Sequence, residues 1–157
     1  MDISFEAGSG KFNYRVCAVI IKDKKILAIT DERSIYYYLP GGRVKFGETA
    51  ENAVLRELYE EVGIFAKIDR PLWINQTFFT EETDSTEYHE LCIYFLVDIQ
   101  GEELTDKGVC FSLKEGRDIN TFEWLTFDSL NRKHFYPEFL KKEIYNLSES
   151  LTLCTEL

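Results

Sequence analysis

The chain has 157 residues, of which 45% are hydrophobic and 15% aromatic, and its formal net charge is −10. This composition predicts one folded domain over residues 1–157. The apolar and aromatic content excludes a disordered chain. A membrane-spanning helix is also excluded, because no run of about 18 uncharged apolar residues occurs. The negative charge argues against a nucleic-acid polymer as the natural partner, because phosphate contacts require a basic surface.

The first segments of the chain predict two paired strands and a short third strand. Residues 1–10 are acidic, carry no signal-peptide pattern and are expected to be flexible. Tyr14–Ile21 is an apolar run rich in β-branched residues, which predicts a buried strand, and Lys25–Thr30 predicts the strand that returns beside it. Tyr36–Leu39 predicts a short strand. We expect it to end at Pro40-Gly41-Gly42, because proline lacks the backbone donor and paired glycines favour a loop.

The following segment predicts a helix from about Ala50 to Val62. Thr49 is suited to cap the N-terminus of this helix, and Gly63 is suited to end it. Apolar residues recur on one side of the helix, which is therefore expected to dock on the sheet. These residues are Val54, Leu58 and Val62.

The second half of the chain predicts further strands separated by polar segments. The expected strands are Ile64–Ile68, Leu72–Phe79, Leu91–Ile99 and Thr121–Thr126, with Asp69-Arg70-Pro71 interrupting the first two. Gln100–Asn120 is expected to be irregular and long enough to be a functional loop. Short helices are expected at Asp128–Lys133 and Glu138–Leu147. This order predicts an α/β (α+β) fold with an antiparallel and mixed sheet covered by two or three helices.

Three acidic residues of the first helix share one face. Glu57, Glu60 and Glu61 stand at positions i, i+3 and i+4, where like charges destabilise a helix unless something compensates them. A solvated acidic surface is the simplest interpretation of such a cluster in isolation. The glycine-rich loop before the helix favours a second interpretation, in which these hard oxygen ligands hold Mg²⁺ or Mn²⁺ against a diphosphate.

The spacing of the whole segment is more specific than the acidic cluster. Gly42 is followed by five free residues, Glu48, seven free residues and then the run Arg56-Glu57-Leu58-Tyr59-Glu60-Glu61-Val62-Gly63-Ile64. At average amino-acid usage, a chance match to its seven fixed residue types has a probability on the order of one in a hundred million. The segment resembles the Nudix box, the signature of the Nudix hydrolases.

The resemblance implies a role for each matched residue. It implies that Glu57, Glu60 and Glu61 are the main metal ligands. It implies that Arg56 orients one of these glutamates, and that Glu48 supports the loop and helix and is a further candidate metal ligand.

The resemblance also implies the fold and the reaction. A backbone carbonyl at Gly41 or Gly42 is implied as a further metal ligand. The implied fold is a Nudix-type α/β/α sandwich with a mixed central sheet, in which the box loop and helix form the active site. The implied reaction is metal-dependent hydrolysis of a pyrophosphate bond in a nucleotide or a nucleoside diphosphate linked to another group.

Several residues outside the box are candidates for the same site. Glu115 is our candidate for the general base or an added metal ligand, because related enzymes carry such a glutamate in a late flexible loop; Glu102 and Glu103 are its rivals. Glu90, at the start of a strand, is a candidate to face the substrate. Arg15 interrupts an apolar strand, where it either holds a phosphate or forms an ion pair between strands.

Aromatic residues are candidates for stacking on a nucleobase, although aromatic residues in strands more often belong to the core. These candidates are Tyr36, Tyr37, Tyr38, Phe46, Phe78, Phe79 and Tyr88.

Marks of particular Nudix subfamilies are mostly missing. ADP-ribose hydrolases tend to carry a proline about fifteen residues past the box, but Gln76–Thr80 contains none. Dinucleoside polyphosphate hydrolases tend to carry a tyrosine slightly later, where this chain has Glu81 and Glu82. A small nucleotide-type substrate is therefore the expected partner. The alternative is a catalytically idle Nudix-fold module that senses nucleotides, but such domains usually lack box glutamates, all of which are present here.

The four cysteines are not spaced as a zinc site. Two of them, Cys17 and Cys92, lie in apolar strand-like runs, where cysteine behaves as a small hydrophobe. This usage predicts free thiols and a cytoplasmic location. We expect a monomer or a homodimer.

Overall fold

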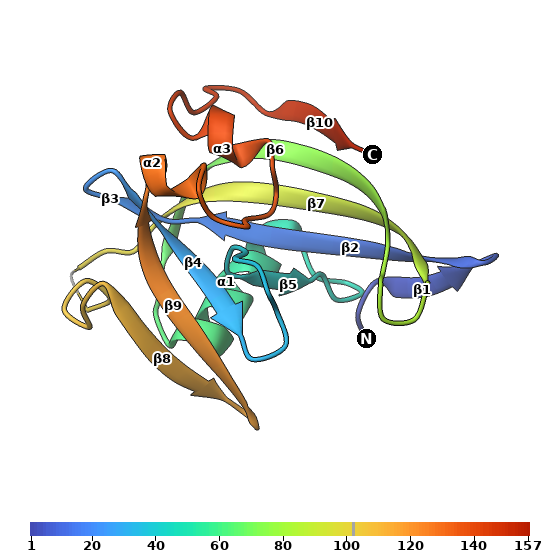
Figure 1. Ribbon diagram of the computed structural model, residues 1–157, viewed down its shortest axis with the longest axis horizontal. Coiled ribbons are helices and arrows are strands. Elements are labelled where there is room, and N and C mark those ends of the chain that lie inside the picture. Colours follow the sequence, from blue (N-terminus) through green and yellow to red (C-terminus); the bar gives the residue numbers. More distant parts are fainter. Residues whose placement is uncertain (102) are drawn as a thin grey trace.

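The computed structural model describes residues 1–101 and 103–157 as two β-sheets with three helices (Figure 1). The larger sheet has the strand order β1-β2-β7-β6-β10, and β5 pairs with β2. Its strands are β1 (Ser4–Ala7), β2 (Gly10–Val19), β5 (Gly41–Arg43), β6 (Lys67–Thr80), β7 (Glu87–Asp98) and β10 (Thr152–Glu156). The β2–β7 and β6–β10 pairs are parallel and the other pairs are antiparallel, so this sheet is mixed.

The smaller sheet is antiparallel and has the order β3-β4-β9-β8. Its strands are β3 (Ile21–Lys22), β4 (Lys25–Asp31), β8 (Cys110–Glu115) and β9 (Asp118–Thr126). The helices are α1 (Ala50–Val62), α2 (Phe127–Leu130) and α3 (Leu140–Glu143). Within the described residues, no helix has the length and apolar character needed to cross a membrane.

The two faces of the sheets support separate core layers. Alternate residues of β2 point to opposite faces, so Val16 and Ala18 pack in one layer whereas Cys17 and Val19 pack in the other. The first layer contains the buried side of α1, and the second contains residues of α2 and α3. Helices therefore cover both faces (Figure 1), and the prediction of an α/β/α sandwich with a mixed central sheet is confirmed.

Helix α1 has the predicted bounds, Ala50–Val62, because its local signals agree with its packing. Thr49 Oγ1 accepts a hydrogen bond from the Asn52 N–H at 3.2 Å, which caps the first turn. Gly63 ends the helix in a left-handed conformation with φ of 73°. The buried residues of the helix are Ala53, Val54, Leu58 and Val62.

The prediction of a strand at Tyr36–Leu39 followed by a glycine loop is wrong in detail. Tyr37 and Tyr38 form isolated bridges. The glycines themselves begin β5, Gly41–Arg43, which pairs with β2. A side chain at Gly41 would place its Cβ 2.1 Å from the Val16 carbonyl oxygen. The missing side chain therefore allows a backbone approach that a sequence pattern alone does not reveal.

Other strands are longer than predicted. Asp69-Arg70-Pro71 does not interrupt β6, which continues to Thr80 with register shifts between Ile68 and Arg70 and between Pro71 and Trp73. Such irregularities accommodate a proline, which cannot donate to the neighbouring strand.

The segment Gln100–Asn120 is not irregular throughout, because it contains β8 and the start of β9. These strands form a hairpin in which Glu115 pairs with Asp118, around Gly116 with φ of 58°. The late helices are shorter than predicted, at four residues each for α2 and α3. Residues 1–10, expected to be flexible, contain β1, and the parallel strand β10 was not predicted.

Candidate active site

Strand β5 positions the glycine loop beside the centre of the larger sheet. Its antiparallel register with β2 places Gly41 next to Cys17 and Gly42 next to Val16. The chain then passes through the loop to α1, whose apolar side packs in the same core layer as Val16. The polar side of α1 therefore meets the glycines, and the carboxylates of the box converge on β5.

Arg56 connects the helix to the loop. Its Nε and Nη2 atoms donate to the two carboxylate oxygens of Glu48 at 2.8 and 3.0 Å, and Nη2 also donates to the Arg43 carbonyl at 3.0 Å. Its Nη1 atom donates to Glu57 at 2.6 Å and to Glu60 at 3.2 Å. The paired contact with the planar guanidinium holds the pKa of Glu48 below its usual value. Arg56 thus contacts three glutamates and the loop at once.

The Glu57 carboxylate packs directly against Gly42. A Cβ atom at Gly42 would lie 2.3 Å from the carboxyl carbon of Glu57, so the missing side chain makes room for this carboxylate. Burial raises the pKa of Glu57, and the charges of Glu60 and Glu115 act in the same direction against the opposing effect of Arg56. Glu57 is therefore a confined carboxylate surrounded by other acids.

Glu61 is the most deeply placed acid of the box. Its Oε2 atom accepts a hydrogen bond from the Gly41 N–H at 3.0 Å. Its pKa is raised to about 9, chiefly because the carboxyl is buried and secondly because Glu57 and Glu115 lie nearby. Glu60 differs from both, since 43% of its side chain is exposed and its Oε1 atom lies 3.9 Å from Lys45 Nζ.

The donor set of the box fits a hard divalent cation, although no binding geometry is preformed. Within residues 1–101 and 103–157, no three His, Cys, Asp or Glu side chains already converge as a metal-binding group. Glu57 and Glu60 instead turn towards Arg56. The box side chains that contact Gly41 and Gly42 do so through carboxylate groups, and burial, with neighbouring acids, raises the pKa of both Glu57 and Glu61. A cation would relieve this repulsion, and oxygen ligands are those that Mg²⁺ and Mn²⁺ prefer.

Glu115 comes from a distant part of the chain to the same group of acids. It ends β8, and its Oε2 atom accepts a hydrogen bond from Asn120 Nδ2 at 3.1 Å. Its charge contributes to the raised pKa of both Glu57 and Glu61, and β8 packs beside α1. Glu115 therefore belongs to a β-hairpin, which corrects the expectation that its segment is an irregular loop.

The remaining candidates come from other segments of the chain. Of the two rivals of Glu115, Glu103 lies in a turn after β7, and Glu102 lies outside the described residues. Glu90 lies on β7, where its Oε2 atom is 3.9 Å from Arg15 Nη1, so the ion pair between strands is present. Sequence analysis missed Asn120, the partner of Glu115. The only sequence feature that points to Asn120 is its position directly before the predicted strand Thr121–Thr126, which would continue through it.

Most of the aromatic candidates pack against other side chains. The Tyr36 ring contacts the Tyr136 ring with centroids 5.1 Å apart, and the Tyr37 hydroxyl donates to Glu123 at 2.7 Å. Phe79 and Tyr88 stack 5.0 Å apart.

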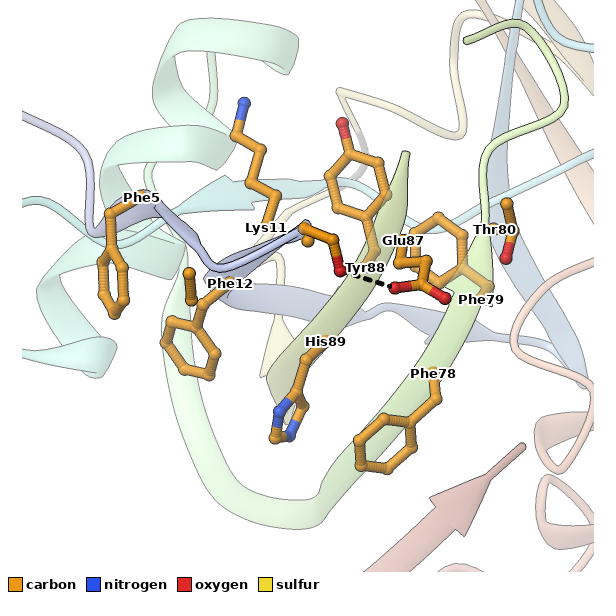
Figure 2. Close-up of a pocket in the computed structure, with 12 residues that line it drawn as sticks. Phe5, Lys11, Phe12, Phe78, Phe79, Thr80, Glu87, Tyr88 and His89 are labelled. Carbon is orange, nitrogen blue, oxygen red and sulfur yellow. Dashed lines mark hydrogen bonds between the residues drawn. The ribbon is translucent and has the colours of Figure 1, made fainter. Parts of the chain in front are cut away.

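An open hollow of about 620 Å³ lies where β1 and β6 end and β2 and β7 begin. Phe79 and Tyr88 belong to its lining (Figure 2). No residue of the box lines this hollow. The hollow is therefore separate from the acidic group.

Comparison with known proteins identifies the family. The NUDIX domain family model matches residues 11–146. An ADP-ribose pyrophosphatase of Methanocaldococcus jannaschii is 31% identical over 131 residues, which span 82% of this chain and 70% of that protein. The solved structure of the mutator protein MutT from Bacillus halodurans has a TM-score of 0.63 at 19% identity, with 91% of this chain and 88% of that chain covered.

A second solved structure, a NUDIX hydrolase from Nitrosomonas europaea, has a TM-score of 0.59 at 22% identity and covers 85% of this chain and 86% of that chain. At these identities the two structures establish the fold alone. The family match and the archaeal relative extend over most of the sequence, including the whole box. The chain therefore belongs to the Nudix family of pyrophosphohydrolases.

Proposed function

We propose that this enzyme hydrolyses a pyrophosphate bond in a nucleotide or in a nucleoside diphosphate linked to another group, with Mg²⁺ or Mn²⁺ as its cofactor. The observation that carries the proposal is the placement of two box carboxylates against the glycines: Glu57 packs on Gly42, and Glu61 accepts a hydrogen bond from the Gly41 N–H. Buried like charges are costly without a compensating cation. Such a cation, when bound, offsets the phosphate charge and stabilises the leaving group.

Each residue of the group has a distinct proposed task. Glu57, Glu60 and Glu61 hold the cation, and a backbone carbonyl at Gly41 or Gly42 is a candidate for a further ligand. The Gly41 N–H fixes the orientation of Glu61 through its 3.0 Å hydrogen bond. Glu115 is proposed to take the proton of the attacking water, because its carboxylate lies beside Glu57 and Glu61.

Two further box residues are proposed to position the metal-binding glutamates and the loop. Glu48 supports the loop through its hydrogen bond from the Lys45 N–H at 3.0 Å, and it remains a candidate metal ligand. Arg56 orients the glutamates that it contacts.

The proposed substrate is a small nucleotide-type molecule. The archaeal relative is named an ADP-ribose pyrophosphatase, which favours a nucleoside diphosphate linked to a sugar. The absence of a proline from Gln76–Thr80 argues against assuming the same substrate for this chain. The net charge of −10 disfavours a nucleic-acid polymer. We also propose a cytoplasmic location, which the four free cysteines support.

A substrate panel tests the proposed function. The purified protein is incubated with nucleoside triphosphates, nucleotide sugars, ADP-ribose and dinucleotides, each with Mg²⁺, with Mn²⁺ and with excess chelator. Phosphate release is coupled to a pyrophosphatase or a phosphatase. Turnover of at least one compound with metal and none with chelator is expected. No turnover under any condition, or full turnover with chelator, contradicts the proposal.

The substitution Arg56→Lys is expected to lower turnover and weaken metal binding by roughly 10–100-fold, the usual effect of losing a residue that orients metal ligands. Lysine keeps the positive charge but cannot make the paired contact with Glu48 while also reaching Glu57. Steady-state kinetics and metal titration measure the effect. If Arg56→Lys matches the native enzyme in both, Arg56 is a surface ion-pair partner and does not orient the site.

The substitution Gly42→Ala is expected to reduce turnover by about 10²-fold, because small displacements of a reacting constellation have effects of this size. The new Cβ would collide with the carboxyl group of Glu57, which lies at the free end of a flexible side chain and can move away. Thermal unfolding should therefore change little while activity and metal affinity fall. Native activity in Gly42→Ala would show that the position of Glu57 against Gly42 is unimportant.

A further inference from the structure

Arg15 lies on the face of the larger sheet opposite α1. The neighbouring residue of β2 on the same face, Cys17, packs in the core layer beneath α2 and α3. Asn13 also points to this face and lies opposite Glu90 in the parallel register of β2 and β7. On this face of β2, the polar residues Asn13 and Arg15 therefore precede the apolar core, which begins at Cys17.

A chain of polar contacts across three strands holds Glu90 in place. Ser4 Oγ on β1 donates to Asn13 Oδ1 at 2.7 Å, and Asn13 Nδ2 donates to Glu90 Oε2 at 3.3 Å. Asn13 is buried, with 3% of its surface exposed. The same Glu90 oxygen lies 3.9 Å from Arg15 Nη1, beyond hydrogen-bond distance. Glu90 therefore balances the charge of Arg15 without occupying its donors.

The guanidinium of Arg15 has unused donors. In the part of the chain that the structure describes, the guanidinium has an ion pair with Glu90 but no hydrogen-bond acceptor. About a third of the side chain, 32%, is exposed. Arg56 shows the contrasting case, since all three of its guanidinium nitrogens donate to acceptors. A partly buried guanidinium with five free N–H donors is incomplete without a ligand or water.

Arg15 is also close to the acidic group of the active site. Its backbone pairs with Arg43 of β5, one residue beyond Gly42. Burial raises the pKa of Tyr38; the charges of Asp31 and Glu61 act in the same direction, and the charge of Arg15 acts against them. Glu61 and Arg15 thus have opposite effects on the pKa of this phenol. The Gly41 N–H contacts Glu61, and Arg15 pairs two positions further along the same β2–β5 ladder, so Glu61 and the backbone of Arg15 meet the same short strand.

We propose that Arg15 binds the phosphate oxygens of the substrate, on the side of the site opposite the box glutamates. This inference rests on the proposed function. A guanidinium forms paired, charge-assisted hydrogen bonds with phosphate, which suits a group whose donors are free. It also supplies a positive charge where the acids of an acidic chain would otherwise repel the substrate.

The test compares Arg15→Met with Arg132→Met, which removes an equal charge from an exposed position outside the site. The substrate found in the panel is used for kinetics, and inorganic pyrophosphate with Mg²⁺ is used for calorimetric binding. Arg15→Met should raise KM and weaken pyrophosphate binding by roughly 10–100-fold, the usual size of a lost charged hydrogen bond. Its kcat should change little, because binding lost equally from ground and transition states affects KM. Arg132→Met should match the native enzyme.

Thermal unfolding and the variant Arg15→Lys distinguish phosphate binding by Arg15 from a purely structural role. If Arg15→Met lowers only the thermal midpoint, with KM and pyrophosphate affinity unchanged, Arg15 merely neutralises Glu90 and the proposal is overturned. Should Arg15→Met fail to fold, Arg15→Lys replaces it, and an intermediate loss of pyrophosphate affinity is expected; native affinity overturns the proposal. The binding measurement also separates this inference from the proposed function, since it needs no turnover.

Discussion

Replacing Glu61 with glutamine is expected to reduce turnover by roughly three orders of magnitude, because a catalytic cation contributes several kcal/mol to the stability of the transition state. The amide retains an oxygen that can accept the Gly41 N–H, so the local geometry should persist. Stability should not fall, because the substitution places a neutral amide where burial and the neighbouring Glu57 already disfavour a charged carboxylate and raise its pKa. Steady-state kinetics and thermal unfolding of the same preparation measure the two effects.

The same helix offers a matched control for this experiment. Glu51→Gln removes an equal charge from an exposed position in the first turn of α1 and should leave turnover near the native value. Glu60→Gln should resemble Glu61→Gln, although Glu60 is more exposed. Native rates in both Glu60→Gln and Glu61→Gln would refute the proposed metal site.

Glu115→Gln is expected to lose roughly 10²–10⁴-fold in turnover, which is the usual contribution of a positioned general base. Glu115 ends β8 beside Glu57 and Glu61, and the hydrogen bond from Asn120 orients its carboxylate. A glutamine oxygen can still accept this hydrogen bond but cannot take a proton from water. The loss should therefore appear in kcat, with the fold and the metal affinity close to those of the native protein.

A rival acid on the same connection provides the comparison. Glu103→Gln should remain near native activity, because Glu103 lies in a turn before the hairpin and is not among the main causes of the raised pKa of Glu57 or Glu61. If Glu115→Gln is as active as the native enzyme, the base belongs to the box helix, and Glu57 becomes the first candidate. Glu57→Gln would then be examined for a change in the pH profile of kcat as well as in its size.

Helix α1 was predictable because its determinants are local. The threonine cap, the terminating glycine and the repeat of apolar residues all act within a few positions of one another, and the helix has the predicted bounds Ala50–Val62. The same short range explains why the box could be recognised. Its spacing places Arg56 and three glutamates on one polar side, and the family match extends from residue 11 to residue 146.

The parts of the site that depend on distant segments could not be predicted in the same way. Gly41 begins a strand only because the backbone of β2 approaches it closely, and Glu115 reaches the box only because β8 and β9 form a hairpin beside α1. Asn120 and Glu90 acquire their partners across strands.

The sequence by itself determined the helix, its acidic face and the family, because these follow from residue types at fixed short offsets. Tertiary structure decided which acids crowd together, which pKa values rise, and whether Arg15 keeps its donors free. The physical reason is that burial and charge act through space, so they depend on strand pairing between segments that the sequence keeps far apart.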